Sequence, residues 1–295
     1  LTTANQDYNV SFTGASNSIA GDTSFLNTGT LSLGDANTDS ITFTGGVNTT
    51  GQASNPSNTL VQGTVETTNT QADLGSVTVG ANSTLRAGTG ALNVGAVTLA
   101  DNVTLTLGSG VASAITVTSL DGTSGGTVSN VTVNTTGAFQ SGAVATDIGT
   151  VTLTQTGGAT FTGAFNADTV TLTDTTGTIA FQGNTTVDTG LTTANQDYNV
   201  SFTGTSNSIA GDTSFLNTGT VTLGDANTDS ITFVGGVNTT GAGSNPSNTL
   251  VQGTVQTTNA QADLGTVAVN ANSTLTTGTA ALNTGALTLA DGVTL

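Results

Sequence analysis

Short apolar–polar–apolar triplets recur along the whole chain, and they predict its secondary structure. Typical examples are Val77-Thr78-Val79, Val97-Thr98-Leu99 and Val131-Thr132-Val133. Alternation with a period of two residues is typical of a β-strand that has one buried and one solvent-facing side. No stretch has helical periodicity, and the 40 glycines of the sequence disfavour helix. We therefore predict an all-β protein.

The spacing of the triplets indicates how the strands are arranged. Several neighbouring triplets are 19 or 20 residues apart, among them those that begin at Val131, Val151 and Val170. Strands this short cannot bury a core within one repeat, whereas stacked repeats pair each strand with its equivalent one turn away. We predict a right-handed parallel β-solenoid (β-helix) with about 20 residues per rung, where a rung is one turn of the solenoid.

Two alternatives to the solenoid stay open at the level of sequence. A β-sandwich also has short strands between turn signals, but it gives no reason for a regular step of about 20 residues. Disorder is typical of chains rich in Gly, Ser and Thr, yet 35% of the residues are hydrophobic and proline occurs only twice. The triplet spacing is irregular over residues 44–76 and 115–131, where we expect longer corner loops.

The sequence also has a second repeat, which is much longer than the spacing of the triplets. Residues 1–105 recur as residues 191–295, with 88 identities in 105 positions at a constant offset of 190. Self-similarity at a fixed period is typical of repeat architectures. We predict one continuous solenoid, with residues 1–190 as the first long repeat and residues 191–295 as a second, incomplete copy. We also expect these 295 residues to be a window from a longer polypeptide, because the second copy stops within a repeat.

The composition excludes several classes of function. Arg86 is the only cation against 18 acidic residues, which gives a net charge of −17. Nucleic-acid binding needs clustered Lys and Arg, so it is excluded. Membrane insertion is not expected, because no run of about 18 apolar residues exists. Cysteine is absent, so there is no disulfide or thiolate metal site. A chain this rich in Thr, Asn, Gly and Asp indicates an extracellular or cell-surface location.

We predict no enzymatic activity. A serine triad needs histidine, and the sequence has none. A polysaccharide lyase needs cations to neutralise its substrate, but Arg86 is replaced by Thr276 in the second copy. A glycosidase with paired carboxylates is chemically possible. No two aspartates, however, stand out from the many that lie beside turn residues.

One acidic motif, present in both copies, is a candidate calcium site. It places three oxygen-bearing side chains at alternate positions of a turn, as at the start of a calcium-binding loop. These residues are Asp35, Asn37 and Asp39 in the first copy and Asp225, Asn227 and Asp229 in the second. The match then ends, because Ser40 replaces the expected Gly and Gly46 replaces the expected bidentate Glu. The alternative is an Asx-rich corner that binds no ion.

Threonines of two consecutive triplets are predicted to face outward. In residues 150–154 and 169–173 they alternate with Val and Leu, so stacked rungs would align their hydroxyl and methyl groups in a ladder. Such a face resembles that of an ice-binding solenoid, and it would also suit glycan contact or lateral packing. Threonine is equally a good β-former on a solvated face.

The strings Gly-Thr-Val-Thr-Leu (149–153), Ala-Thr-Phe-Thr-Gly (159–163) and Asp-Thr-Val-Thr-Leu (168–172) carry a resemblance to known proteins. They resemble the β-strand repeats of bacterial autotransporter passengers, and are similar to filamentous-haemagglutinin-type and other repetitive surface exoproteins. The resemblance covers the whole chain but is one of composition. It implies secretion, a β-solenoid stalk and a role in adhesion or surface assembly.

Two hypotheses for function follow. In the first, the chain is a structural segment of an extracellular bacterial fibre, sheath or surface layer, whose partner is a second copy in a head-to-tail or lateral homopolymer. In the second, it is the stalk of a cell-surface adhesin whose binding tip lies outside this sequence. Direct recognition of cell-surface glycans or ice by the threonine face is a third and less favoured interpretation.

Overall fold

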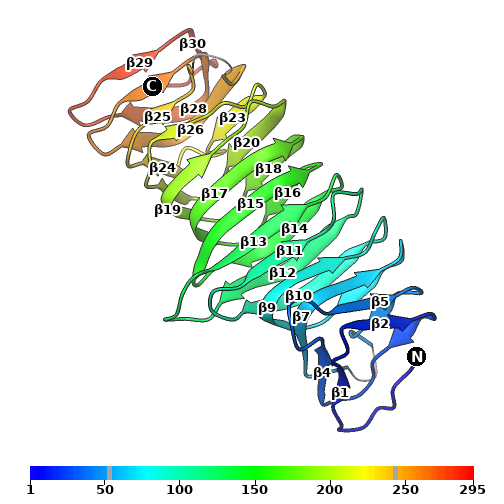
Figure 1. The fold of residues 1–295 in the computed structure, drawn as a ribbon. Helices are drawn as coiled ribbons and strands as arrows, with labels where there is room; N and C mark the ends of the chain where they lie inside the picture. The colour runs from blue at the N-terminus through cyan, green and yellow to red at the C-terminus, as the bar shows by residue number, and fades with distance from the viewer. Residues whose placement is uncertain (52–54, 242–244) are drawn as a thin grey trace. The chain divides into compact units, whose positions relative to one another are not determined.

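The computed structural model describes residues 1–51, 55–241 and 245–295. In these ranges the chain is all-β, with parallel strands stacked as a β-solenoid of about 13 turns and roughly 21 residues per turn (Figure 1). This confirms the predicted fold class and excludes a sandwich. The described residues contain no helix, and so none that could cross a membrane.

The chain divides into two compact units, Leu1–Gly149 and Thr150–Leu295, called unit 1 and unit 2 below. The predicted repeat boundary between residues 190 and 191 lies within unit 2, inside a strand. Unit 1 contains β1 (Val10–Phe12), β2 (Ser16–Ile19), β3 (Thr23–Ser24), β4 (Thr30–Leu33), β5 (Ser40–Phe43), β6 (Val47–Asn48), β7 (Asn58–Thr67), β8 (Ala72–Leu74), β9 (Val77–Arg86), β10 (Leu92–Leu99), β11 (Thr104–Leu107), β12 (Ile115–Gly122), β13 (Ser129–Asn134) and β14 (Phe139–Val144).

Unit 2 continues with strands of similar length. It contains most of β15 (Ile148–Thr156), then β16 (Ala159–Phe161), β17 (Phe165–Thr175), β18 (Gly177–Phe181), β19 (Thr185–Thr192), β20 (Tyr198–Phe202), β21 (Ser206–Ile209), β22 (Thr213–Ser214), β23 (Thr220–Leu223), β24 (Ser230–Phe233), β25 (Val237–Asn238), β26 (Asn248–Thr257), β27 (Ala262–Leu264), β28 (Val267–Thr276), β29 (Leu282–Thr284) and β30 (Leu287–Leu289).

The strands of residues 1–122 form three parallel columns that the chain visits in a fixed order. Column A contains β1, β4, the first halves of β7 and β9, and the second half of β10. Column B contains β2, β5, the second halves of β7 and β9, and β11. Column C contains β3, β6, β8, the first half of β10 and the start of β12. Each rung therefore contributes one strand to each column.

The second copy repeats this pairing within unit 2. Its column A holds β20, β23, β26, β28 and β30, and its column B holds β21, β24, β26 and β28. Its column C is the separate sheet of β22, β25, β27 and β29. Eight consecutive strands, β2 to β9, have bounds that recur in β21 to β28 at an offset of 190. The duplicated sequence therefore forms the same local structure twice.

The core is a set of stacked inward-facing side chains, as the alternation predicts. In unit 2 the rings of Phe161, Phe181 and Phe202 lie above one another, with centroid separations of 5.1 and 4.9 Å and nearly parallel planes. Phe165 packs edge-on against Phe181 at 5.0 Å. All four side chains are buried. Identical side chains stack in this way because parallel strands in register place equivalent Cβ atoms about 4.8 Å apart.

The expectation of long corner loops over residues 44–76 and 115–131 is wrong for most of the described residues. Strands β7 and β8 occupy much of the range 44–76, and β12 occupies much of the range 115–131. Residues 52–54 of the first range lie outside the described residues. Strand β7 was missed because Thr59, Gly63 and Thr67 take inward positions where apolar residues were expected. The inward and outward positions alternate without a break along β7, and the register shift opposite Val61 and Gly63 arises from two extra residues in β9.

Candidate functional site

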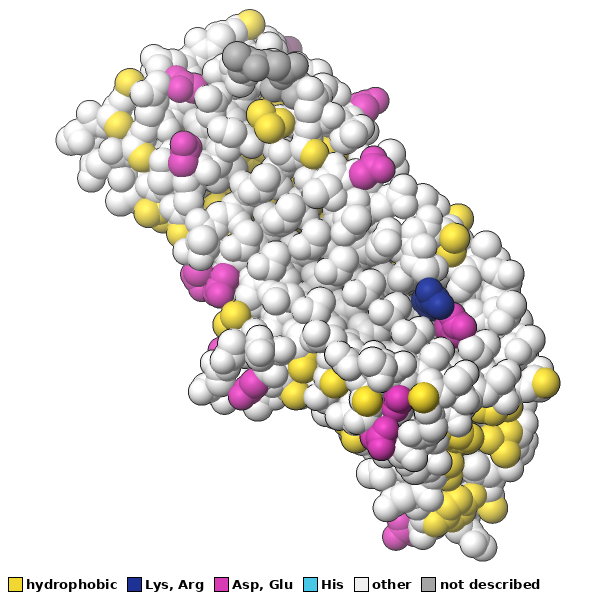
Figure 2. Space-filling model, in the orientation of Figure 1, with side chains coloured by type: hydrophobic (Ala, Val, Ile, Leu, Met, Phe, Trp, Pro, Cys, Tyr) yellow, Lys and Arg dark blue, Asp and Glu magenta, His cyan; other side chains and the backbone are white. Residues whose placement is uncertain are grey.

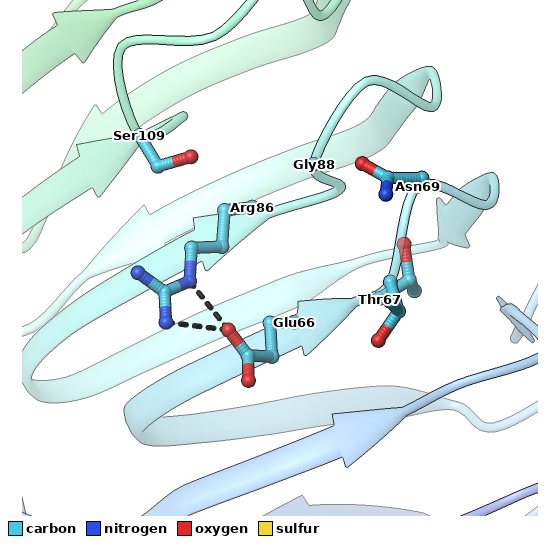
Figure 3. A pocket seen from close by; sticks show the side chains of 7 residues that line it. Glu66, Thr67, Asn69, Arg86, Gly88 and Ser109 are labelled. Atoms are coloured by element: carbon cyan, nitrogen blue, oxygen red, sulfur yellow. Dashed lines mark hydrogen bonds and ion pairs between the residues drawn. The ribbon is translucent and has the colours of Figure 1, made fainter.

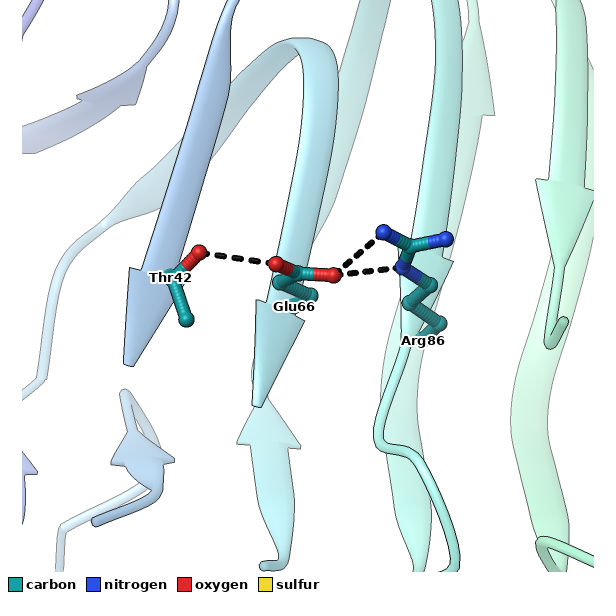
Figure 4. A network of polar contacts seen from close by, with 3 residues as sticks. All are labelled: Thr42, Glu66 and Arg86. Atoms are coloured by element: carbon teal, nitrogen blue, oxygen red, sulfur yellow. Dashed lines mark hydrogen bonds and ion pairs between the residues drawn. The ribbon is translucent and has the colours of Figure 1, made fainter. Parts of the chain in front are cut away.

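On the face shown in Figure 2, most of the surface is neither charged nor hydrophobic, and the one basic side chain of the sequence lies beside an acidic one. These two side chains are Arg86 and Glu66. Arg86 Nε donates a hydrogen bond to Glu66 Oε2 at 2.6 Å, and Arg86 Nη2 lies 2.5 Å from the same oxygen. Thr42 Oγ1 donates to Glu66 Oε1 at 2.8 Å. The three residues form a row across β5, β7 and β9 because column B pairs them in register (Figure 4).

The ion pair lines a polar pocket of about 330 Å³ (Figure 3). Its other lining residues are Thr67, Thr68, Asn69, Gly88 and Ser109. Asn69 has a φ of 58° and its Oδ1 accepts the N–H of Thr89 at 3.0 Å, so this amide is engaged in holding the corner. The pocket thus offers a partly exposed guanidinium and several hydroxyl and amide groups. These groups could hydrogen-bond a small polar molecule but supply no paired acid and base.

In the second copy the charge pair is replaced as a unit. Gln256 stands in place of Glu66 and Thr276 in place of Arg86, and Gln256 Nε2 donates to Thr232 Oγ1 at 2.8 Å. The two altered positions are 20 residues apart, which is one rung, so their joint change was a sequence signal for contact. The contact with the threonine on the neighbouring strand is kept while both charges are removed, which indicates that this contact supports the fold.

We expect a double-mutant cycle on Glu66→Gln and Arg86→Thr to give a coupling energy below about 1 kcal/mol. The side chains of Arg86 and Glu66 are 40% and 24% exposed, so solvent screens their attraction. Urea unfolding followed by far-ultraviolet circular dichroism measures the coupling energy. Adding about 1 M salt should reduce the coupling energy further. Gln256→Glu combined with Thr276→Arg in the second copy is the matched control and should install a similar coupling. A coupling of several kcal/mol would contradict this description.

The side chain of Asn58 has a hydrogen-bond partner for its amide oxygen, whereas that of its copy Asn248 does not. Asn58 Oδ1 accepts a hydrogen bond from Thr78 Oγ1 on the next rung at 3.3 Å, and Asn58 Nδ2 lies 3.0 Å from the same hydroxyl oxygen. In the second copy the threonine is replaced by Ala268. Oδ1 of Asn248 is buried without a hydrogen-bond partner among the residues that the structure describes. A buried and unpaired polar atom lowers stability.

Ala268→Thr is therefore expected to raise the free energy of unfolding by about 1 kcal/mol, because it supplies the missing hydrogen-bonding partner. The reverse change, Thr78→Ala, should lower it by a similar amount. Thermal and urea unfolding measure both, and Ala268→Val separates the hydroxyl from the added β-branched bulk. If the valine variant gains as much as the threonine variant, the hydrogen bond is not the cause.

The six residues predicted as a calcium site lie in two equivalent turns. Asp39 is buried, and its Oδ2 accepts the N–H groups of Asp35 at 2.9 Å and Ala36 at 3.1 Å. In the second copy Asp229 accepts from Asp225 and Ala226 at 2.8 and 3.0 Å. The side chains of Asp35, Asn37, Asp225 and Asn227 are exposed. The buried aspartate of each turn therefore holds the turn closed.

The electrostatics of the first turn follow from these contacts. The N–H of Asp35 is the main cause that holds the pKa of the Asp39 carboxyl below its ordinary value. The pKa of Asp35 is raised, mainly by a hydrogen bond with Asp39. The described residues include no group of three or more His, Cys, Asp or Glu side chains that could hold a metal ion. Calcium binding at Asp35, Asn37 and Asp39 stays a prediction, which unfolding with and without calcium would test.

The stabilising effect of Asp39 should depend on pH. Its folded-state pKa lies below the unfolded value near 3.8, so its contribution is present above that pH and is lost as the pH falls through the lower folded value. We expect Asp39→Asn to lower the unfolding midpoint at pH 6 and the deficit to shrink below pH 3.8. Asp174→Asn, which removes an exposed carboxylate, is the control. A deficit independent of pH would contradict the assigned role of the charge.

The predicted alignment of threonines on neighbouring rungs is confirmed. Thr150 pairs with Thr169 and Thr152 with Thr171, while the intervening Val and Leu side chains are buried. The ladder continues to Thr192, but Gly190 takes the place next to Thr169. Glycan or ice binding by this face stays a prediction.

The two outermost rungs expose side chains that the equivalent rungs bury. Tyr8 is 37% exposed, whereas its copy Tyr198 is 1% exposed. Leu289 is 40% exposed, whereas Leu99 at the equivalent position is fully buried. In the first copy β12 covers Leu99, and in the second copy β18 pairs with the strand that begins at Tyr198.

Comparisons with protein-family models, curated proteins and solved structures found no match to this chain. The resemblance to repetitive bacterial surface exoproteins therefore stays a prediction.

Proposed function

We propose that this chain is a non-catalytic structural segment of an extracellular bacterial fibre, sheath or surface layer that grows by the stacking of rungs. The single observation that carries the proposal is the duplication of β2 to β9 as β21 to β28 at an offset of 190 residues. Each further copy of such a unit adds length without needing a new fold, because every rung contacts only its neighbours.

The use of the polar side chains supports the same function. Asp39 closes its turn, Thr42 and Glu66 join adjacent strands, and Asn58 bonds to the next rung. These groups are engaged in contacts between and within rungs, as expected of a scaffold. Only 6% of the residues are charged, and the face in Figure 2 shows few charged side chains, so lateral packing of many copies is expected once salt screens the net charge of −17.

Electron microscopy and fibre diffraction of the purified chain test the proposal. We expect filaments that give a reflection near 4.8 Å along the filament axis, the spacing of stacked parallel strands. Circular dichroism before and after assembly should show unchanged native strand content, which distinguishes stacking from aggregation of unfolded chains. Immunogold labelling of intact source cells should place the protein outside the cell. Monodisperse particles that never associate, or an exclusively intracellular label, would contradict the proposal.

A further inference from the structure

Unit 1 carries one polar side chain per rung on the outer face of column C. The register of the parallel strands aligns these side chains, which are Ser24, Asn48, Asp73, Asn93, Thr116 and Gln140. The residues on either side of each one in the chain are buried. Successive rungs are about 4.8 Å apart. This polar row therefore presents hydroxyl, amide and carboxylate groups at a regular step along the column.

Two surface hollows follow the polar row and share Asp73. Hollow 1 has a volume of about 330 Å³, and its lining includes Asp73, Asn93 and Thr116. Hollow 2 has a volume of about 250 Å³, and its lining includes Ser24, Asn48 and Asp73. The two hollows thus extend along five consecutive rungs, a shape that suits an elongated ligand.

Hollow 1 is open because two glycines on successive rungs have no side chain. The N–H of Gly95 donates to the carbonyl oxygen of Gly75 at 3.1 Å, and a Cβ at Gly95 would lie 2.6 Å from that oxygen. The close approach of the two rungs therefore requires Gly95. It does not require Gly75, where φ lies outside the left-handed region and a Cβ would meet no atom closer than 3.4 Å. The second copy nevertheless keeps this glycine, as Gly265, and an open hollow explains why.

The central groups of the polar row are held in fixed orientations. Gln71 Nε2 donates to both carboxylate oxygens of Asp73, each at 2.8 Å, and Asn93 Nδ2 donates to Asp73 Oδ1 at 2.7 Å. The amide oxygen of Asn93 and the hydroxyl of Thr116 have no hydrogen-bond partner among the residues that the structure describes. Polar groups that are already ordered lose little entropy when a ligand binds to them.

The second copy retains this network. Gln261 Nε2 donates to the two carboxylate oxygens of Asp263 at 2.9 and 2.7 Å, and Asn283 Nδ2 donates to Asp263 Oδ1 at 2.7 Å. The hydrogen bonds from Asn283 and Gln261 lower the pKa of the Asp263 carboxyl, which keeps it charged. The ion pair on column B is replaced between the two copies, whereas this network on column C is kept.

We propose that the polar row and its two hollows bind a linear, uncharged polysaccharide that lies along column C. The hydroxyl groups of sugars both donate and accept hydrogen bonds, so they match a row of amide, carboxylate and hydroxyl groups. A net charge of −17 repels acidic polysaccharides. The site is distinct from the threonine ladder of β15 and β17, and binding there does not depend on filament assembly.

The same surface is poorly suited to a peptide. The strands of column C already pair with a strand on either side, as β10 does with β8 and β12, so their edges are not free to accept an added strand. Leu74 and Val94 line hollow 1, but both side chains are buried, so no apolar cavity is open to a peptide side chain.

Electrophoresis in native gels that contain soluble polysaccharides tests the proposal, because the net charge of −17 carries the chain through the gel. The neutral probes are linear glucans, xylans, mannans and galactans, and the acidic probes are alginate and polygalacturonate. Beads coated with polylysine are the basic probe. We expect retardation by at least one neutral probe and by neither acidic probe. Sedimentation with the neutral probe should show equal binding at low and high salt, because uncharged groups of the ligand make the contacts.

Variants altered in both copies test the amides of the row. Asn93→Ala combined with Asn283→Ala should weaken binding about tenfold, the effect of losing one or two hydrogen bonds. Thr98→Ala combined with Thr288→Ala is the matched control, because these exposed threonines lie on the outer face of column A. The control variant should bind as the wild type does.

A second pair of changes tests the hollows. Gly75→Leu combined with Gly265→Leu places a side chain in hollow 1 and in its copy, and should abolish retardation. Circular dichroism and urea unfolding show whether this variant keeps the fold. If it does not, the asparagine variant alone decides the matter.

Three results would overturn the proposal. The first is no retardation by any neutral polysaccharide, and the second is equal retardation of the wild type and the folded variants. The third is binding to the basic probe alone that high salt abolishes, which would identify charge as the cause. None of these results bears on the fibre function, which filament formation tests separately.

Discussion

Replacing Phe181 with alanine is expected to lower the free energy of unfolding of unit 2 by about 3–5 kcal/mol. The Phe181 ring contacts three others, being stacked between Phe161 and Phe202 and packed edge-on against Phe165. Its side chain is buried, and the rungs on either side fix its neighbours. The surrounding side chains therefore cannot move in to fill the cavity that the ring would leave. Substitutions that leave an unfilled cavity cause the largest loss of stability.

Urea unfolding followed by far-ultraviolet circular dichroism measures the global effect, because the chain has no tryptophan to report by fluorescence. Hydrogen exchange in peptides from residues 150–295 localises it, since a repeat protein can open in parts. Phe12→Ala is the matched control, because Phe12 is equivalent to Phe202 but only half-buried. We expect it to cost about 1–2 kcal/mol. Equal costs for Phe12→Ala and Phe181→Ala would contradict the assignment of the stack as core.

Gly34→Ala is expected to be the second most damaging change, at about 3 kcal/mol. Gly34 has a φ of 85°, which costs an L-residue about 1–2 kcal/mol. A Cβ at this position would also lie 1.9 Å from the carbonyl oxygen of Gln62 on the next rung. Relief of that overlap requires the two rungs to separate, with a typical cost of about 1–3 kcal/mol.

Gly125→Ala separates the two causes. Gly125 has nearly the same φ, 86°, but a Cβ there would meet nothing within 4 Å. This variant should therefore show only the conformational cost, about 1–2 kcal/mol. Differential scanning calorimetry and urea titration of both variants give the comparison. Equal destabilisation by Gly34→Ala and Gly125→Ala would show that close rung contact at Gly34 does not matter.

The parallel solenoid could be predicted because its strands are short and repeat a local pattern. Triplets such as Val151-Thr152-Leu153 and Val170-Thr171-Leu172 form strands, and their Val and Leu side chains are buried as predicted. The threonine pairings between β15 and β17 also follow, because the 19-residue step between these triplets sets the register. Most of the fold can therefore be predicted from the local alternation and from the constant spacing of the triplets.

The polar sites were less predictable because they depend on positions one rung apart. Asp39 was grouped with Asp35 and Asn37 by spacing alone, whereas the structure engages its carboxylate with two backbone N–H groups. The pairing of Glu66 with Arg86 was not predicted either. Their joint replacement by Gln256 and Thr276 was visible in the sequence, but it acquires meaning only once a rung of about 20 residues is known.

By itself, the sequence determined which side chains face inward, because the period of two along a strand is set by backbone geometry. Only the tertiary structure decided how deeply each is buried. Residues 1–10 and 191–200 are identical in sequence, yet Tyr8 is exposed and Tyr198 is buried. The difference arises because β18 pairs with the strand that begins at Tyr198, whereas no described strand covers Tyr8. Burial depends on the neighbouring rung, which is remote in sequence, and local sequence cannot encode it.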